Sequence, residues 1–199
     1  MADDLPRLFL ARHGDTEWTD SGRHTGRTDI ALTAAGEERA RQLGTSLQSL
    51  TFVHVFTSPL IRARKTCELA SFGGAAEVDP DLLEWDYGRY EGKTTSEIRA
   101  ERPDWEMFRD SCPDGESAHD VGARADRFIQ RARAAKGRVL AFAHGHIIRT
   151  IAARWLGMPP EAGRAFFCAP GSIGELSFEH GSLDQPIIRA WNFVRTPWN

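Results

Sequence analysis

Short apolar segments alternate with segments of helical periodicity, and this alternation is the feature that most constrains the fold. Arg7 to Ala11 (RLFLA), Phe52 to Phe56 (FVHVF) and Val139 to Ala143 (VLAFA) have the length and composition of buried strands. Apolar residues then recur at spacings of three and four in the segments that follow, over about 34–48, 60–70 and 148–155. Strands that alternate with helices predict an α/β/α sandwich of three layers with a mostly parallel sheet.

The rest of the chain fits the same plan. A short strand is expected near Glu77, and an aromatic-rich excursion over the sheet covers roughly 80–120, with helical segments within 94–110. Another helix is marked by Val121, Ala125, Phe128 and Ala132, and two more strands are expected near Ile173–Phe178 and Ile187–Val194. We see no internal repeat and no linker, so we expect one domain over residues 1–199.

Composition excludes several classes of protein. The 199 residues are 41% hydrophobic and 27% charged, and no stretch has the apolar length that a membrane span needs. The first residues are acidic and carry no basic leader, which favours a cytoplasmic protein. Three cysteines without a CxxC pair indicate neither a disulfide framework nor a zinc ribbon. The net charge of −3 argues against nucleic-acid binding, so any bound anion must be attracted by particular arginines.

Three predicted junctions between a strand and a helix carry residues that can bind an anion or take part in catalysis. They are Arg12-His13-Gly14, the segment from Ser58 to Arg62, and His144-Gly145. In open α/β sheets such junctions lie at one edge, where ligands bind beyond the carboxyl ends of the strands. Ser58 is expected to cap the second helix, with Pro59 at its first position, so that Arg62 falls in the first turn.

These residue types point to a phosphate site. Guanidinium groups bind phosphate with two parallel hydrogen bonds, and an imidazole can be a neutral nucleophile near pH 7. We expect His13 to attack phosphorus, with Arg12, Arg62 and His144 stabilising the charge on the phosphoryl oxygens. Glycine at 145 would allow the backbone to approach a bound group.

A general acid must protonate the leaving oxygen. Glu84 is the first candidate, because the segment LLEWDYG surrounds it with apolar residues that can raise the pKa of a carboxyl group. Asp86 and Glu91 remain alternatives at this stage.

The chain resembles the histidine phosphatase superfamily, branch 1, whose members are phosphoglycerate mutase-like. The resemblance covers about residues 7–160 and rests on LFLARHGDTEW, TGRTDIALTAAGEERARQLG, FTSPLIRARKTCELA, LLEWDYGRYEGKT, CPDGES and VLAFAHGHIIRTIAARWLG. It implies that His13 is phosphorylated during the reaction, that Arg12, Arg62 and His144 hold the phosphate, and that Glu84 donates the proton. Members of the family use no metal, and we expect no cofactor here.

Departures from the mutases indicate a phosphatase. Cofactor-dependent phosphoglycerate mutases usually carry Asn where this chain has Thr19, which we place in the phosphate site, and their capping region is longer and more basic. The chain looks most similar to the sedoheptulose-bisphosphatase subgroup, which implies a small sugar phosphate or bisphosphate as substrate. Arg23, Thr25 and Arg27 could then contribute to substrate specificity.

Three other functions remain open. The chain could be a phosphoglycerate mutase, or a phospho-ligand-binding module without catalysis. A metallohydrolase would use His144 and His146 as a ligand pair. We expect a small phosphorylated substrate and neither a nucleic-acid nor a membrane partner; the sequence leaves the oligomeric state open.

Overall fold

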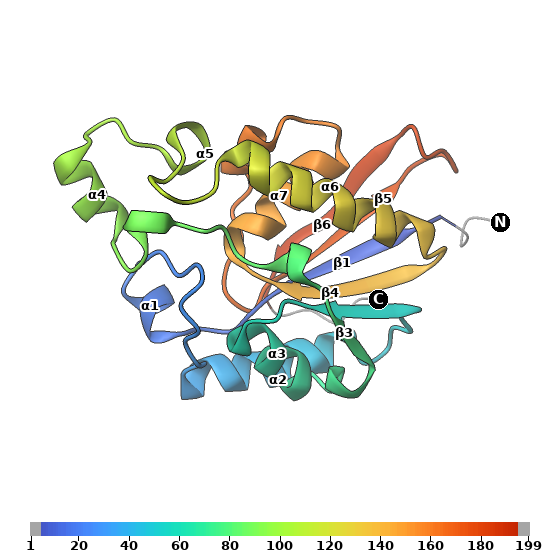
Figure 1. The fold of residues 1–199 in the computed structure, drawn as a ribbon. Coiled ribbons are helices and arrows are strands. Elements are labelled where there is room, and N and C mark those ends of the chain that lie inside the picture. The colour runs from blue at the N-terminus through green and yellow to red at the C-terminus, as the bar shows by residue number, and fades with distance from the viewer. Residues whose placement is uncertain (1–4, 195–199) are drawn as a thin grey trace.

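A six-stranded sheet forms the centre of the computed structural model, which describes residues 5–194 (Figure 1). The strands are β1 (Arg7–Arg12), β2 (His54–Thr57), β3 (Ala76–Val78), β4 (Arg138–Ala143), β5 (Ile173–Phe178) and β6 (Pro186–Phe193). Their order across the sheet is β3-β2-β4-β1-β5-β6. The first four strands in this order pair in parallel, and β5 runs antiparallel to both β1 and β6. The predicted α/β fold with a mostly parallel sheet is therefore confirmed.

Helices cover both faces of this sheet (Figure 1). The helices are α1 (Glu17–Asp20), α2 (Ala34–Leu47), α3 (Ile61–Leu69), α4 (Thr95–Glu101), α5 (Met107–Asp110), α6 (Ala118–Ala134) and α7 (Gly145–Trp155). Short 3₁₀ turns are η1 (Gly73–Ala75), η2 (Pro80–Leu82), η3 (Gly88–Tyr90) and η4 (Pro160–Ala165).

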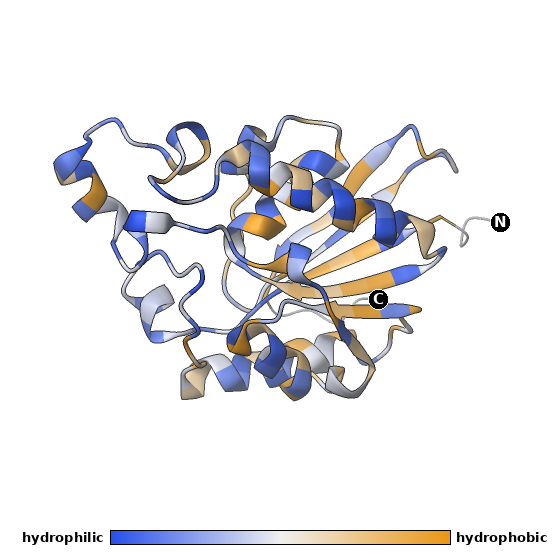
Figure 2. Ribbon diagram, in the orientation of Figure 1, coloured by the Kyte–Doolittle hydropathy of each residue, from blue (hydrophilic) through white to orange (hydrophobic). Residues whose placement is uncertain are grey.

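The side chains of β1 alternate between two hydrophobic cores, as the pleat of a strand requires. Leu8 and Leu10 join the cluster that contains the buried faces of α6 and α7. Phe9 and Ala11 join the other cluster, with the buried leucines of α2 and with Cys67 of α3. Figure 2 shows the apolar strands between helices whose outer faces are polar. This two-sided burial explains the continuous apolar run in β1 and holds the end of that strand in a fixed position.

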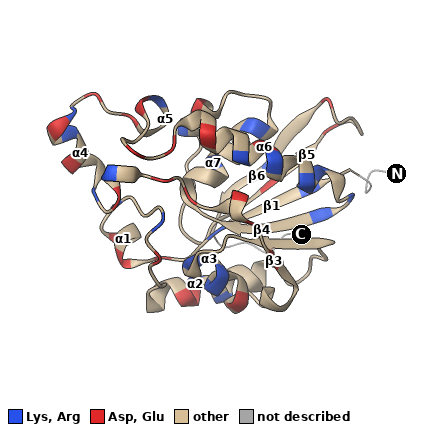
Figure 3. Cartoon of the chain, viewed as in Figure 1, with Lys and Arg blue, Asp and Glu red and all other residues tan. Residues whose placement is uncertain are grey.

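Charged residues of both signs intermix along the helices that cover the sheet (Figure 3). Some of them pair across elements, as Arg131 of α6 does with Asp79 and Asp81. No helix within residues 5–194 combines the length and the apolar character that crossing a bilayer would require.

The predicted start of the second helix was wrong. Ser58 and Pro59 do not begin α3; its first residue is Ile61, and Leu60 is its N-cap without a side-chain bond. Asp29 instead accepts a hydrogen bond from the backbone N–H of Ile61 at 2.7 Å. The Ser58 hydroxyl lies 2.7 Å from Nε2 of His144, so this side chain is bound to the histidine that follows β4.

The excursion between β3 and α6 is bonded to the loop that follows β1. Arg23 and Thr94 form an isolated antiparallel bridge, and His24 exchanges backbone hydrogen bonds with Lys93 and Gly92 at 2.9 Å each. The expected helical region within 94–110 is present as α4 and α5, with a break between them. These bonds bring two segments that are far apart in sequence to one edge of the sheet.

Candidate active site

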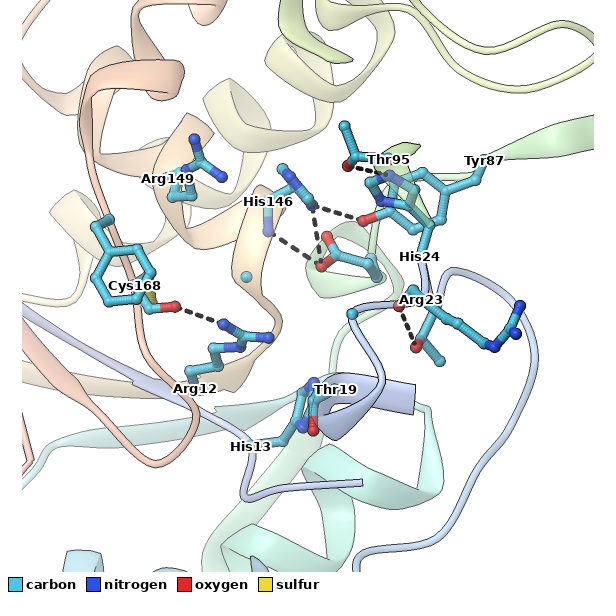
Figure 4. Close-up of a pocket in the computed structure, with 15 residues that line it drawn as sticks. Arg12, His13, Thr19, Arg23, His24, Tyr87, Thr95, His146, Arg149 and Cys168 are labelled. Atoms are coloured by element: carbon cyan, nitrogen blue, oxygen red, sulfur yellow. Dashed lines mark hydrogen bonds and ion pairs between the residues drawn. The ribbon is translucent and has the colours of Figure 1, made fainter. Parts of the chain in front are cut away.

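A cavity of about 280 Å³ lies at the carboxyl ends of β1 and β4, where the strand-helix junctions were expected to meet. Figure 4 shows the side chains around it. Its walls come from the loop after β1, the excursion, α7 and the segment before β5. The lining residues are Arg12, His13, Thr19, Gly22, Arg23, His24, Thr25, Glu84, Tyr87, Thr95, Gly145, His146, Arg149, Phe167 and Cys168.

His13 stands directly after β1, with 3% of its surface exposed. Its Nδ1 lies 2.7 Å from the carbonyl oxygen of Gly14. A carbonyl can only accept, so Nδ1 carries the proton and Nε2 keeps a free lone pair. Burial lowers the pKa of His13 well below 6.5, and the charges of Arg62 and Arg12 lower it further. The ring is therefore neutral near pH 7 and has the form that a nucleophile requires.

Gly14 permits the tight packing behind His13. A Cβ at this position would lie 2.2 Å from the carbonyl oxygen of Gly36 in α2, which no side chain could tolerate without a backbone shift. The glycine in the RHG tripeptide is therefore required by the close contact between this turn and α2.

His144 lies beside His13, with 5.1 Å between the ring centroids. Nε of Arg62 donates to its Nδ1 at 3.1 Å, so the proton of the neutral ring is on Nε2 and is donated to the Ser58 hydroxyl. Burial is the main cause that lowers the pKa of His144 well below 6.5, and Arg62 is the next. The two histidines are therefore both neutral, and they are bonded to different partners.

Arg62 is fully buried, and most of its donors bind the protein itself. Besides His144, it donates to the carbonyl oxygens of Thr28, Thr25 and Gly26 at 2.9–3.0 Å. The guanidinium therefore holds the loop after β1 against His144, and Arg62 and His144 lie behind the cavity wall instead of forming it. Their direct contact with phosphate stays a prediction.

Arg12 presents a guanidinium at the wall of the cavity. Its Nη1 donates to the carbonyl oxygen of Cys168, while its buried Nε has no hydrogen-bond partner within the described part of the chain. A Cβ on Gly145 would come within 3.2 Å of Cζ of Arg12. Glycine at 145 therefore makes room for this guanidinium, whereas the sequence suggested room for the ligand.

Glu84 is the carboxylate of the cavity wall, and its side chain is bound to the start of α7. Its two oxygens accept hydrogen bonds from the backbone N–H groups of Trp85, His146 and Ile147 at 2.9–3.0 Å. The two donors from α7 belong to the first turn of the helix, where N–H groups lack partners within the helix.

The alternative acids are bonded elsewhere. Asp86 accepts the backbone N–H of Gly88, and Glu91 accepts those of Gly26 and Thr28. Neither lines the cavity, so the geometry favours Glu84 as the acid.

Thr19, which was expected in the phosphate site, and the three residues expected to govern specificity divide into two groups. Thr19, Arg23 and Thr25 line the cavity, although the Thr19 hydroxyl donates to the carbonyl of Thr16 at 2.8 Å in the capping box of α1. Arg27 does not line it. Arg27 lies 3.5 Å from Asp86 and 3.8 Å from Glu116, and neither of these carboxylates lines the cavity. The expectation that Arg27 contacts substrate is not supported by this geometry.

Several other residues of the cavity wall were not predicted as phosphate or specificity residues, among them His24, Tyr87, His146 and Arg149. Nδ1 of His146 lies 2.6 Å from the Tyr87 hydroxyl. Burial lowers the pKa of His24 to about 4 and that of His146 well below 6.5, so both rings are neutral. The aromatic-rich excursion was the available signal for Tyr87, and the loop after β1 was the signal for His24.

The metal-ligand pair that we considered does not form. His144 faces Ser58 and Arg62, whereas His146 faces Tyr87, because residues two apart at a helix start point in different directions. Within residues 5–194, no group of three or more His, Cys, Asp or Glu side chains is arranged to hold a metal ion.

Comparison with known proteins agrees with this geometry. Residues 8–193 match the profile of the histidine phosphatase superfamily (branch 1). An acid phosphatase of Mycobacterium tuberculosis is 41% identical over 186 residues, which cover 92% of this chain and 91% of the relative. Sedoheptulose 1,7-bisphosphatase of Saccharomyces cerevisiae is 33% identical, with 99% and 97% covered. The solved structure of an open reading frame product of M. tuberculosis superimposes with a TM-score of 0.89, at 38% identity, and covers 94% and 97% of the two chains. The chain therefore belongs to the histidine phosphatase superfamily, branch 1, as a phosphoric monoester hydrolase.

Proposed function

We propose that the protein hydrolyses a small sugar phosphate or bisphosphate through a phosphohistidine intermediate on His13. The observation that carries this proposal is the state of the His13 ring. It is neutral and buried, its Nδ1 proton is held by Gly14, and its Nε2 is free in a cavity that also contains Arg12 and Glu84.

The reaction follows from these groups in two steps. Nε2 of His13 attacks phosphorus, the bond from phosphorus to the leaving oxygen breaks, and Glu84 gives that oxygen a proton. Water then attacks the phosphorus of the phosphohistidine, the bond from phosphorus to Nε2 of His13 breaks, Glu84 accepts a proton from this water, and inorganic phosphate leaves. Arg12 offers donors to the phosphoryl oxygens in both steps. Arg62 and His144 are proposed to contact the phosphoryl group as well, and Arg62 fixes the tautomer of His144.

The substrate class rests on the cavity and on the relatives. A volume of about 280 Å³ suits a small metabolite. Neutral imidazoles and hydroxyls on the wall away from His13, such as His24, Tyr87 and Thr95, offer hydrogen bonds to sugar hydroxyl groups. The yeast relative is named for a sugar bisphosphate, which agrees with this choice.

A screen of phosphate release tests the proposal. Wild-type protein should release phosphate from sugar mono- or bisphosphates, and His13→Ala should abolish turnover. His180→Ala, in an exposed turn, is the matched control and should retain full activity. Transfer to a second substrate with little phosphate release would indicate a mutase instead. Absence of both phosphate release and phosphoenzyme would indicate a binding module.

Two further expectations from the sequence stay predictions. These are the organisation of residues 1–199 as one domain and a cytoplasmic location.

A further inference from the structure

The backbone around Glu84 has no regular secondary structure of its own. Residues 83–87 lie between the turns η2 and η3, outside any helix or strand. The Glu84 carboxylate is bonded to the start of α7, and these bonds locate the carboxylate but leave the flanking backbone to other partners. A general acid must lie within hydrogen-bond reach of the leaving oxygen. The groups that fix this segment therefore also determine where the acid stands.

Arg124 of α6 binds the segment on the side that precedes Glu84. Its Nη1 donates to the carbonyl oxygens of Asp81 and Leu83 at 2.9 and 3.0 Å. Its Nε and Nη2 donate to the two carboxylate oxygens of Glu116 at 2.7 and 2.9 Å. A planar guanidinium can make all of these bonds at once, whereas the ammonium group of a lysine cannot.

Glu116 binds the same segment on the side that follows Glu84. Its carboxylate accepts the backbone N–H of Asp86, and its own backbone N–H donates to the carbonyl of Asp86, at 2.9 Å each. Its carbonyl accepts the indole N–H of Trp85 at 2.7 Å. Glu116 directly precedes Ser117, whose capping box fixes the start of α6. This helix therefore holds the backbone on both sides of the acid.

The pair of Arg124 and Glu116 lies outside the cavity wall, so neither side chain is placed to touch the substrate. Only 11% and 17% of the two side-chain surfaces are exposed. A hydrogen-bond network that is buried and satisfied in this way makes its surroundings rigid. The pair can therefore act on the reaction through the position of Glu84.

We propose that Arg124 and Glu116 are positioning residues for the general acid, and that they hold residues 83–87 so that the Glu84 carboxylate reaches the leaving oxygen. This inference rests on the proposed function, because it takes Glu84 to donate the proton. Loosening the pair should slow the departure of poor leaving groups more than that of good ones. A purely structural role would change stability, or would slow all substrates by the same factor.

The kinetics of Arg124→Lys and Glu116→Gln test the proposal. The assay measures kcat/KM for phenyl phosphate and for p-nitrophenyl phosphate, whose leaving groups differ in their need for a proton. Arg154→Lys and Asp126→Asn are the matched controls. Arg154 donates to the Asp126 carboxylate through Nε and Nη2 at 2.8 and 2.9 Å and to the carbonyl of Met158 at 3.0 Å. Asp126 belongs to α6 as well, but none of these bonds reaches residues 83–87.

The measured quantity is kcat/KM for phenyl phosphate divided by that for p-nitrophenyl phosphate. This ratio should fall about 5-fold or more in Arg124→Lys and about 3-fold or more in Glu116→Gln. It should stay within about 2-fold of the wild-type ratio in both controls. In a Glu84→Gln background, Arg124→Lys should not lower the ratio further, because the acid on which it acts is already absent.

An unchanged ratio in Arg124→Lys and Glu116→Gln would overturn the positioning role. An equal fall in the controls, or a further fall in the Glu84→Gln background, would overturn it as well. If Arg124→Lys does not fold, Glu116→Gln and its control Asp126→Asn decide by the same ratio. An unchanged ratio in Glu84→Gln itself would instead contradict the acid role in the proposed function.

Discussion

Substitution of Glu84 by Gln separates two roles that the structure gives to one carboxylate. Glu84 accepts three backbone N–H bonds, two of them from the first turn of α7, and it is the acid candidate on the cavity wall. Gln keeps the shape, but its NH₂ group cannot accept. The variant therefore loses at least one charge-assisted hydrogen bond, which stabilises by about 1.5–3 kcal/mol. Loss of the negative charge at the helix start costs a further ~0.5 kcal/mol. The free energy of unfolding should fall by about 2–3.5 kcal/mol.

The catalytic effect should depend on the leaving group. Alkyl alcohols such as sugars need a proton as they depart, and loss of a general acid slows such reactions about 10²- to 10⁴-fold. p-Nitrophenolate leaves without one, so its release should slow by less than about 10-fold. The assay compares kcat/KM for a sugar phosphate and for p-nitrophenyl phosphate, alongside urea unfolding of both proteins.

Glu91→Gln is the matched control for this experiment. Glu91 also accepts backbone N–H bonds, from Gly26 and Thr28, but lies outside the cavity. The Glu91→Gln variant should have a lower free energy of unfolding, and any change in its kcat/KM should be the same for both substrates. Equal losses for both substrates in Glu84→Gln would refute the acid role, and a leaving-group dependence in Glu91→Gln would transfer that role to Glu91.

Three further predictions concern stability, packing and metal independence. His24 has a folded-state pKa of about 4 against 6.5 when unfolded, so protons favour the unfolded state. Its contribution to stability is complete above pH 6.5 and should decline by up to ~3 kcal/mol as pH falls to 4. Urea unfolding of His24→Gln should show a flatter pH dependence, and an unchanged slope would contradict this reasoning. Gly145→Ala should displace the Arg12 guanidinium, 3.2 Å from the new Cβ, and lower kcat/KM about 10-fold or more. Reduced thermal stability with an unchanged kcat/KM would show that displacement of the Arg12 guanidinium does not affect catalysis. Activity should persist in EDTA, because guanidinium groups neutralise the charge of the phosphate in place of a metal ion. Activity that is lost in EDTA and restored by a divalent ion would favour a metalloenzyme.

The sheet and the junction residues could be predicted because both depend on local patterns. Apolar runs identified β1 and β4, and parallel strands place their carboxyl ends at one edge, which brought His13 and Gly145 to the same cavity. Residue chemistry suggested the role of His13, and resemblance to a known family agreed with it and selected Glu84 among the three acid candidates.

Tertiary contacts decided the features that the sequence did not reveal. Ser58 matches the pattern of a helix cap, but its hydroxyl binds His144, and this contact joins residues 86 positions apart. Arg62 fits the sequence pattern of a phosphate-binding residue, but its N–H groups donate to carbonyl oxygens of the loop after β1. No pattern in the sequence distinguishes Arg149, because its orientation depends on the carbonyls of Gly163 and Arg164 in η4. Side chains that bind distant backbone leave no periodic signal in the sequence.

Rapid quenching of the wild-type enzyme with a ³²P-labelled sugar phosphate tests the central claim most directly. The account predicts a labelled phosphoenzyme that is stable in base and labile in acid, with the label on the peptide that contains His13. The intermediate should form and decay at rates compatible with turnover, and it should be absent from His13→Ala. Phosphate release without any such intermediate, or a label on another residue, would contradict the account.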